Sequence, residues 1–359
     1  MQAAAEKVRG LYPRPATYWI DCDKIGLTDK QDVVDFLAGV PRDQHRRRLL
    51  DVLDTAEPWE PSKASLADGV RRNTDAIITG KLVDAPLGFK QVATLSRATA
   101  PGIVTILAAP GGSAKTWVLL NWCCTWFDSG VPFAYLGLEE DRTYCLERIQ
   151  ALRESNIGVL DPDWITGNAD AKRAADDRQE PYLHAIGQNL WDAPNEPMAL
   201  PDIAEWVRRR AREGRRVLVV DPITAAAAER ECYIHDRRFV TDIKTIARLT
   251  ETTVILATHR KKGGRGFGLD DLCGGAAYAQ LAQCVLWIER HDAPKKALCM
   301  TPAGRTHANL SFSLHVAKAR KAPGVGKSIG FQVDWPKATF HECGLVIREK
   351  SKTDEGGDE

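Results

Sequence analysis

The sequence lacks a long hydrophobic run and a large excess of charge of either sign. None of its apolar stretches approaches the roughly 20 residues that a transmembrane helix requires, and its start lacks the apolar core of a secretory signal. Lysine and arginine total 49 against 48 aspartate and glutamate, a net charge of +1. Proteins that coat nucleic acid with their whole surface are usually more basic, so any nucleic-acid contact should be local. We therefore expect a soluble, cytoplasmic protein without membrane contact.

Closely spaced cysteine pairs are also missing. None of the nine cysteines belongs to a C-x-x-C pair, although Cys123 and Cys124 are neighbours. Zinc sites usually depend on such spacing, so no zinc site is expected. In a cytoplasmic protein the cysteines are expected to be buried, reduced thiols.

What is present is typical of a folded protein. The 359 residues are 44% hydrophobic and 27% charged, and this length corresponds to about two domains. Composition separates a small N-terminal segment at 1–60, a helical segment at 61–81, a large domain at 82–349 and an acidic, flexible tail at 350–359.

The large domain alternates short apolar stretches with longer helical ones. Continuous apolarity is typical of strands that are buried on both faces. The order predicts an α/β fold with a mainly parallel, twisted sheet flanked by helices, and ligands at the carboxyl ends of the strands. The predicted strands are 103–109, 132–138, 216–221, 253–259, 284–289 and 310–318.

The first of these strands runs into a short glycine-containing loop that an apolar helix follows. This order is the setting of a Walker A motif, in which backbone N–H groups and the helix dipole bind phosphate. Ala109 and Ala114 stand where the motif has glycine, and the alternative is an ordinary turn before a helix. Lys115 is expected to reach the β- and γ-phosphates, and Thr116 to ligate Mg²⁺. The residues expected to contact ATP are Pro110, Gly111, Gly112, Ser113, Ala114, Lys115 and Thr116.

Polar residues follow three other predicted strands. Asp221 has the form of a Walker B aspartate, which holds magnesium through its water shell. Glu139 can activate an attacking water, although acidic residues are also common at the start of a helix. His259 can sense the γ-phosphate, although a single histidine is more often structural. We expect the three side chains to lie beside the phosphate loop.

In order and spacing, these motifs resemble the RecA-like ATPase domain of hexameric replicative helicases, in the DnaB and plasmid RepA helicase group. The resemblance covers about residues 62–335. YLGLEED resembles the strand with the catalytic glutamate, here Glu139, and VLVVDPIT the Walker B segment, here with Asp221. LATHRKK is similar to the family's sensor strand, with His259 at the sensor position. The segment 316–324 is similar to the family's Lys-x-Arg element.

The resemblance implies a ring of six subunits with ATP and Mg²⁺ bound between protomers. Lys318 and Arg320 would then reach the γ-phosphate of the neighbouring subunit, with Arg320 as the arginine finger. The helix at 61–81 would be a linker that docks on the neighbouring subunit. The implied partners are single-stranded DNA and a primase or loader protein.

A basic, glycine-rich stretch follows His259. It is expected to line a central channel and contact the phosphate backbone without reading sequence, and the alternative is a solvated loop. Cys273 and Gly274 take the places of an arginine and a glutamate in a DnaB loop. The residues expected to contact nucleic acid are Arg260, Lys261, Lys262 and Arg265.

The N-terminal segment contains a D-x-D-x-x-G motif at 21–26 that resembles the metal-binding strand end of a Toprim primase domain. The upstream glutamate motif of such domains is missing, so we interpret Asp21 and Asp23 as noncatalytic. The segment is then a Toprim-like remnant, the end of a longer primase–helicase, or a structural turn.

Together these patterns predict an ATP-dependent DNA helicase that translocates on single-stranded DNA as a ring. One alternative is a RecA-like recombination or regulatory ATPase that does not unwind DNA. The other is a nucleotide-binding scaffold without turnover, which Ala114 in the phosphate loop suggests.

Overall fold

The computed structural model describes residues 18–19, 33–53, 57–58, 63–80, 82–193, 196–227, 232–261, 263–264, 266–273 and 275–347. The chain divides into two compact units, Met1–Lys81 and Leu82–Glu359. The D-x-D-x-x-G motif and the acidic tail lie outside the described residues, as do Lys262, Arg265 and Gly274.

The first unit contains short elements and one longer helix. The expected helical segment is present as α4, in which the apolar residues Val70, Ile77 and Ile78 are exposed. The described elements are β1 (Tyr18–Trp19), α2 (Val33–Leu37), η2 (Arg42–Gln44), α3 (His45–Leu53), β2 (Glu57–Pro58) and α4 (Lys63–Ile78), and β1 pairs with β2 antiparallel.

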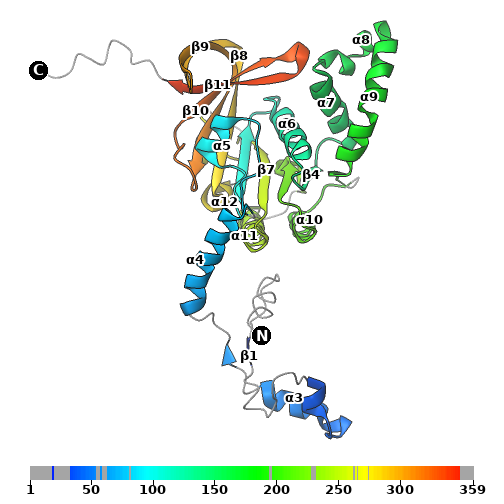
Figure 1. Cartoon of the computed structure of the whole chain (residues 1–359), viewed down its shortest axis with the longest axis vertical. Coiled ribbons are helices and arrows are strands. Elements are labelled where there is room, and N and C mark those ends of the chain that lie inside the picture. Colours follow the sequence, from blue (N-terminus) through cyan, green and yellow to red (C-terminus); the bar gives the residue numbers. More distant parts are fainter. Residues whose placement is uncertain are drawn as a thin grey trace, which may run out of the picture. The chain divides into compact units, whose positions relative to one another are not determined.

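The second unit is built on a nine-stranded sheet with the order β11-β10-β9-β8-β3-β7-β6-β4-β5 (Figure 1). Strands β3 to β7 pair in parallel and β8 pairs in parallel with β3, whereas β9, β10 and β11 are antiparallel. The predicted mainly parallel α/β fold is therefore confirmed, with an antiparallel part added. The strands are β3 (Val104–Ala109), β4 (Phe133–Gly137), β5 (Leu190–Asp192), β6 (Val217–Asp221), β7 (Thr253–His259), β8 (Cys284–Thr301), β9 (Gly304–Ala319), β10 (Ser328–Asp334) and β11 (Thr339–Ile347).

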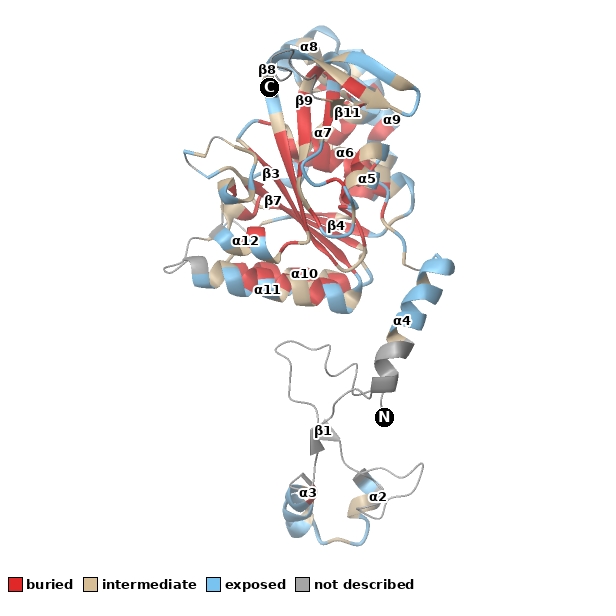
Figure 2. Ribbon diagram, turned by 90° about the vertical axis from the view of Figure 1, so that its left-hand side faces the viewer, coloured by how far each residue is buried: buried red, intermediate tan, exposed pale blue. Residues whose placement is uncertain are grey.

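Helices cover both faces of this sheet, and the buried strands lie between them (Figure 2). Successive residues of β3 point to opposite faces, so Leu107 joins one apolar cluster and Ile106 the other. One face carries α5 (Lys90–Ser96), α6 (Lys115–Asp128), α7 (Arg142–Glu154) and α9 (Ala169–Gly187), and the other α10 (Leu200–Arg212), α11 (Cys232–Thr250) and α12 (Gly275–Leu281). Shorter helices are η3 (Ile157–Leu160), α8 (Pro162–Gly167), η4 (Ile223–Ala225), η5 (Leu269–Asp271) and η6 (Trp335–Lys337).

The sequence pattern missed part of the antiparallel region. β8 and β9 extend beyond the predicted 284–289 and 310–318, because their outer halves form a hairpin whose polar residues are exposed. The register of this pair shifts between Arg290 and Lys295. β5, β10 and β11 were not predicted, since none of them is a continuous apolar run.

The cysteines that the structure describes are unpaired. Cys123, Cys124, Cys145, Cys284 and Cys299 are buried, as expected, whereas Cys273 and Cys343 are partly exposed. Among the described helices, none combines the length and the apolar character that crossing a bilayer demands.

A partly buried histidine joins three strands of the antiparallel region. His315 on β9 contacts Ser328 on β10 through Nδ1 at 2.7 Å and Glu289 on β8 through Nε2 at 2.9 Å. Its ring stacks on Phe267 with 4.7 Å between centroids. Burial lowers the pKa of His315 below 6.5, and Glu289 opposes this shift. The neutral ring therefore donates from Nε2–H to Glu289 and accepts from Ser328.

This lowered pKa predicts a loss of stability in acid. In the unfolded chain His315 binds its proton near pH 6.5, but the folded protein binds it only at lower pH. Stability should therefore fall as pH drops below about 6.5 and level off below the folded pKa. In urea unfolding from pH 7.5 to pH 5, His315→Gln should show a weaker pH dependence than the wild type. The same substitution at the exposed His341 is the control, and equal slopes for both variants would contradict the assignment.

Candidate active site

The carboxyl ends of four parallel strands form one edge of the sheet. β3, β7, β6 and β4 are neighbours in that order, Ala109 lies beside His259, and Gly137 lies beside Asp221. The phosphate loop, Glu139, Asp221 and His259 therefore meet at this edge. The sequence predicted the strands at 216–221 and 253–259 but not that they are neighbours. The parallel pairing of β6 with β7 brings their carboxyl ends together.

The loop after β3 makes a left-handed turn into α6. Gly112 has φ +68° and Ala114 has φ +66°, and Lys115 is the first residue of α6. Ala114 thus adopts a conformation that costs a residue with a side chain roughly 1–2 kcal/mol and costs glycine nothing. The alanine is accommodated with strain, and the loop keeps the strand–turn–helix path expected for phosphate binding.

Lys115 is buried and points toward His259. The residue is only 7% exposed, and Nζ lies 3.1 Å from His259 Nδ1. Burial lowers the pKa of Lys115, and the charges of Asp221 and Glu139 oppose this shift. A buried ammonium is suited to receive an anion such as a phosphate.

His259 links Lys115 to Glu139. Its Nδ1 atom faces the Lys115 ammonium, and its Nε2 atom lies 3.5 Å from Glu139 Oε1. The Glu139 side chain is 50% exposed and therefore accessible to water. The turn that places it requires Gly137, since a Cβ there would lie 2.5 Å from the Glu140 carbonyl oxygen.

The helix-start alternative that we considered for the acidic residues applies to Asp141. Its carboxylate accepts a hydrogen bond from the Tyr144 N–H at 2.7 Å and caps α7. Glu139 lies before this cap and faces the site instead.

Asp221 is buried at the end of β6 and 4% exposed. Its Oδ2 accepts hydrogen bonds from the Thr116 hydroxyl at 2.8 Å and from the Tyr135 hydroxyl at 2.7 Å. Burial raises the pKa of Asp221, whereas these two hydrogen bonds and the charge of Lys115 lower it. The hydroxyl and carboxylate are hard oxygen donors of the kind that Mg²⁺ takes. Among the described residues no group of three or more His, Cys, Asp or Glu could hold a metal.

Two residues at this edge were missed by the sequence reasoning. Tyr135 sits inside an apolar strand, and only the pairing of β4 with β6 brings it to Asp221. Arg290 of β8 donates to the Gly112 carbonyl oxygen at 2.8 Å. Arg290 and Gly112 are far apart in the sequence, and no motif signals the contact.

Lys318 and Arg320 lie at the opposite edge of the sheet. Lys318 pairs with Val285, near the start of β8, and β8 begins beside Thr105 at the start of β3. From Thr105 to Ala109, where the phosphate loop begins, β3 runs for four residues, or about 13 Å. Lys318 is therefore separated from the phosphate loop of its own chain by about this length of strand. Lys318 Nζ donates to the carbonyls of Ala279 and Gln280, at 2.6 and 3.0 Å.

Arg320 is exposed at this opposite edge. Among the described residues its side chain has no hydrogen bond or ion pair, and its backbone N–H donates to the Gln283 carbonyl at 2.9 Å. Arg320 and the phosphate loop of the same chain are therefore too far apart to act together.

The basic stretch after His259 differs partly from the expectation of an open channel loop. The Arg260 guanidinium lies over the rings of Phe267 and Trp287, at 4.6 and 5.7 Å from their centroids, and its Nε and Nη2 are buried. Arg260 therefore packs against the sheet. Lys261 is exposed, whereas Lys262 and Arg265 lie outside the described residues.

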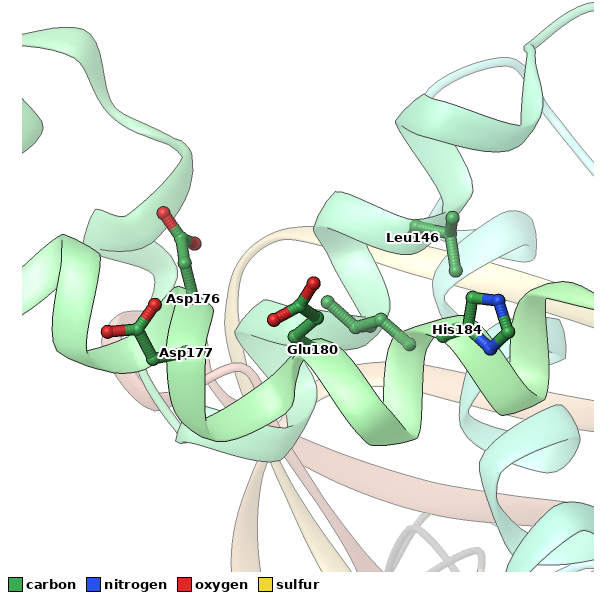
Figure 3. Close-up of a pocket in the computed structure, with 6 residues that line it drawn as sticks. Leu146, Asp176, Asp177, Glu180 and His184 are labelled. Carbon is green, nitrogen blue, oxygen red and sulfur yellow. The ribbon is translucent and has the colours of Figure 1, made fainter.

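A groove on the outer helices has the wrong charge for a nucleotide. It lies along α9 and is lined by Asp176, Asp177, Glu180, Leu183 and His184 together with Leu146 of α7 (Figure 3). Three carboxylates would repel a triphosphate. The phosphate loop remains the candidate site.

Comparison with known proteins supports this assignment. Residues 93–265 match the protein-family model described as an AAA domain. This span contains the phosphate loop, Glu139, Asp221 and His259 and ends before Arg320. The comparison with curated proteins gives no match.

Many solved structures share the fold, including these two. One is the structure of an isolated ATPase domain, which matches with a TM-score of 0.58 and 15% identity, over 78% of this chain and 99% of that chain. A DnaB-like replicative helicase, in a structure that also concerns its interactions with primase, matches with a TM-score of 0.56 and 15% identity, over 86% of this chain and 73% of that chain. The expected RecA-like fold of DnaB-type ATPase domains is therefore confirmed.

The strain at Ala114 gives a test of the loop conformation. Ala114→Gly should raise the free energy of unfolding by about 0.5–1 kcal/mol, because relief of the left-handed strain exceeds the added chain entropy of glycine. Ala109→Gly is the matched control. Ala109 is fully buried in β3, so its replacement should lower the stability by about 1 kcal/mol. Urea unfolding measures both, and a loss of stability in both variants would contradict the strained turn.

Proposed function

We propose that this chain is an ATP-dependent DNA helicase motor that acts in the cytoplasm as a ring, with ATP hydrolysed between subunits. The observation that carries the proposal is the meeting of Lys115, Thr116, Asp221 and Glu139 at one sheet edge, with Arg320 exposed at the other. The fold shared with DnaB-type ATPase domains supports it.

Each residue at the edge has a role in binding the triphosphate. The loop at 110–114 presents backbone N–H groups and the N-terminus of α6 to the phosphates. Lys115 exchanges its contact with His259 for the β- and γ-phosphate oxygens. Thr116 and Asp221 hold Mg²⁺, which when bound neutralises charge on the phosphates.

Hydrolysis requires a positioned water in line with the γ-phosphate. The oxygen of this water attacks the γ-phosphorus while Glu139 accepts a proton from the water. The bond between the γ-phosphorus and the β–γ bridging oxygen breaks. ADP and inorganic phosphate are the products. His259 lies between Lys115 and Glu139, so a phosphate that draws Lys115 away changes the contacts of His259.

The loop after His259 is the proposed route from ATP to DNA. Arg260 follows His259 directly and anchors the loop on Phe267 and Trp287. In this proposal Lys261, Lys262 and Arg265 contact the backbone of single-stranded DNA, which needs charge and no base-specific contact. Arg260 fixes the start of the loop.

The proposed ring accounts for the separation of Arg320 from its own phosphate loop. A closed ring of identical subunits brings two different edges of the same domain together. Arg320 then completes the site of the next subunit, and Lys318 joins it by leaving the carbonyls of α12. We assign α4 as the linker that packs on a neighbour through its exposed Val70 and Ile77. A primase or loader protein is the proposed further partner.

The experiment that tests this function is ATP hydrolysis at moderate salt, with and without single-stranded DNA, followed by strand separation on a forked duplex. We expect hydrolysis to be stimulated by DNA and the fork to be unwound. Lys115→Ala should reduce turnover at least a hundredfold, because the charge on the transferring phosphoryl group loses its main partner. Turnover that DNA does not affect would instead indicate a regulatory ATPase. Nucleotide binding without turnover would indicate a scaffold.

Mixing two inactive variants tests the shared site. Arg320→Ala and Lys115→Ala should each lose turnover, by about a thousandfold for the arginine finger. In mixed rings about a quarter of the interfaces would combine an intact loop with an intact arginine, so some hydrolysis should return. Lys321→Ala, at the next position along the chain, is the control and should keep wild-type turnover. Full activity of Arg320→Ala alone would contradict the role.

A further inference from the structure

We propose that Tyr135 is a positioning residue that holds the Asp221 carboxylate in the orientation in which it receives the magnesium of MgATP. This inference rests on the proposed function, since it concerns the same phosphate site. It assigns a role to the first residue of the YLGLEED segment, in which the motif comparison gave a role only to Glu139.

The contact is short and comes from inside the sheet. The Tyr135 hydroxyl donates to Asp221 Oδ2 at 2.7 Å, and Tyr135 is 2% exposed. The two residues lie on neighbouring parallel strands, with Tyr135 beside Val219 and Gly137 beside Asp221. The tyrosine therefore reaches along the β4–β6 pair to the end of β6.

The tyrosine ring is fixed by the core around it. It belongs to the apolar cluster beneath α6 and α7, and the whole residue is buried. A side chain held so tightly offers its hydroxyl in one direction. Close packing thus makes Tyr135 a rigid donor.

Among the described residues Asp221 accepts from one other side chain, Thr116, which is also a proposed magnesium ligand. The Thr116 hydroxyl donates to the same Oδ2 atom at 2.8 Å. If its oxygen also ligated magnesium, the Thr116 hydroxyl would serve the metal and the carboxylate at the same time. The terminal torsion of an aspartate is soft, so a second donor that stays in place keeps the carboxylate plane fixed. Tyr135 supplies that donor.

Hydrogen bonds to a carboxylate that serves a metal are worth about 10- to 100-fold in metal affinity. Tyr135→Phe removes only the hydroxyl and preserves the packing of the ring. We therefore expect this variant to bind magnesium in the nucleotide complex about tenfold more weakly. Binding of the nucleotide without magnesium uses the loop and Lys115 and should not change.

The experiment is a titration of the full chain with a fluorescent, non-hydrolysable ATP analogue, in chelator and then in rising concentrations of MgCl₂. In Tyr135→Phe the magnesium concentration for half-maximal binding should rise about tenfold, while the affinity in chelator stays at the wild-type value. Tyr278→Phe is the matched control. It removes a buried hydroxyl that donates to Asp236 at 3.3 Å on α11, outside the phosphate site.

A double-mutant cycle separates this role from a general effect on folding. In an Asp221→Asn background, Tyr135→Phe should cause no further shift in magnesium dependence, because the tyrosine acts through the carboxylate. An additive further shift would overturn the inference, as would equal magnesium titrations for Tyr135→Phe and the wild type. If magnesium leaves nucleotide binding to the wild type unchanged, the proposed function itself fails.

Discussion

Parallel pairing of β3, β7, β6 and β4 is the constraint on which the candidate site depends. Parallel strands end on the same side of a sheet, so residues that follow separate strands are brought within a few ångströms of one another. Lys115, Asp221 and His259 come from three distant parts of the chain and meet only there. The helices on both faces keep this edge fixed by burying the strands.

At the same edge, charged side chains lie where they have little contact with water. Lys115 and Asp221 are both largely buried, and burial acts against the charged form of each. Hydroxyl groups from Thr116 and Tyr135 compensate for the lost solvent at Asp221. A site that holds charge at this cost is suited to bind a charged substrate, for which these groups are already oriented.

The sequence predicted the buried half of the sheet well. β3, β4, β6 and β7 are continuous apolar runs because both of their faces are covered, and each was placed to within a residue or so at its ends. The outer half was predicted less completely. β10 and β11 have polar or partly exposed positions, and the β8–β9 hairpin has an exposed outer half, so the apolar pattern that marks a strand is interrupted.

By itself the sequence determined which residues are candidates for the chemistry, because a loop, a strand end and their polar residues are local and adjacent along the chain. Tertiary structure alone decided how they are arranged. It gave Ala114 a left-handed conformation and Ala109 a buried strand position, although both replace a motif glycine. It also brought Tyr135 to Asp221 and set Arg320 at the far edge. These are contacts between strands, and strand order and register appear only when the whole sheet has formed.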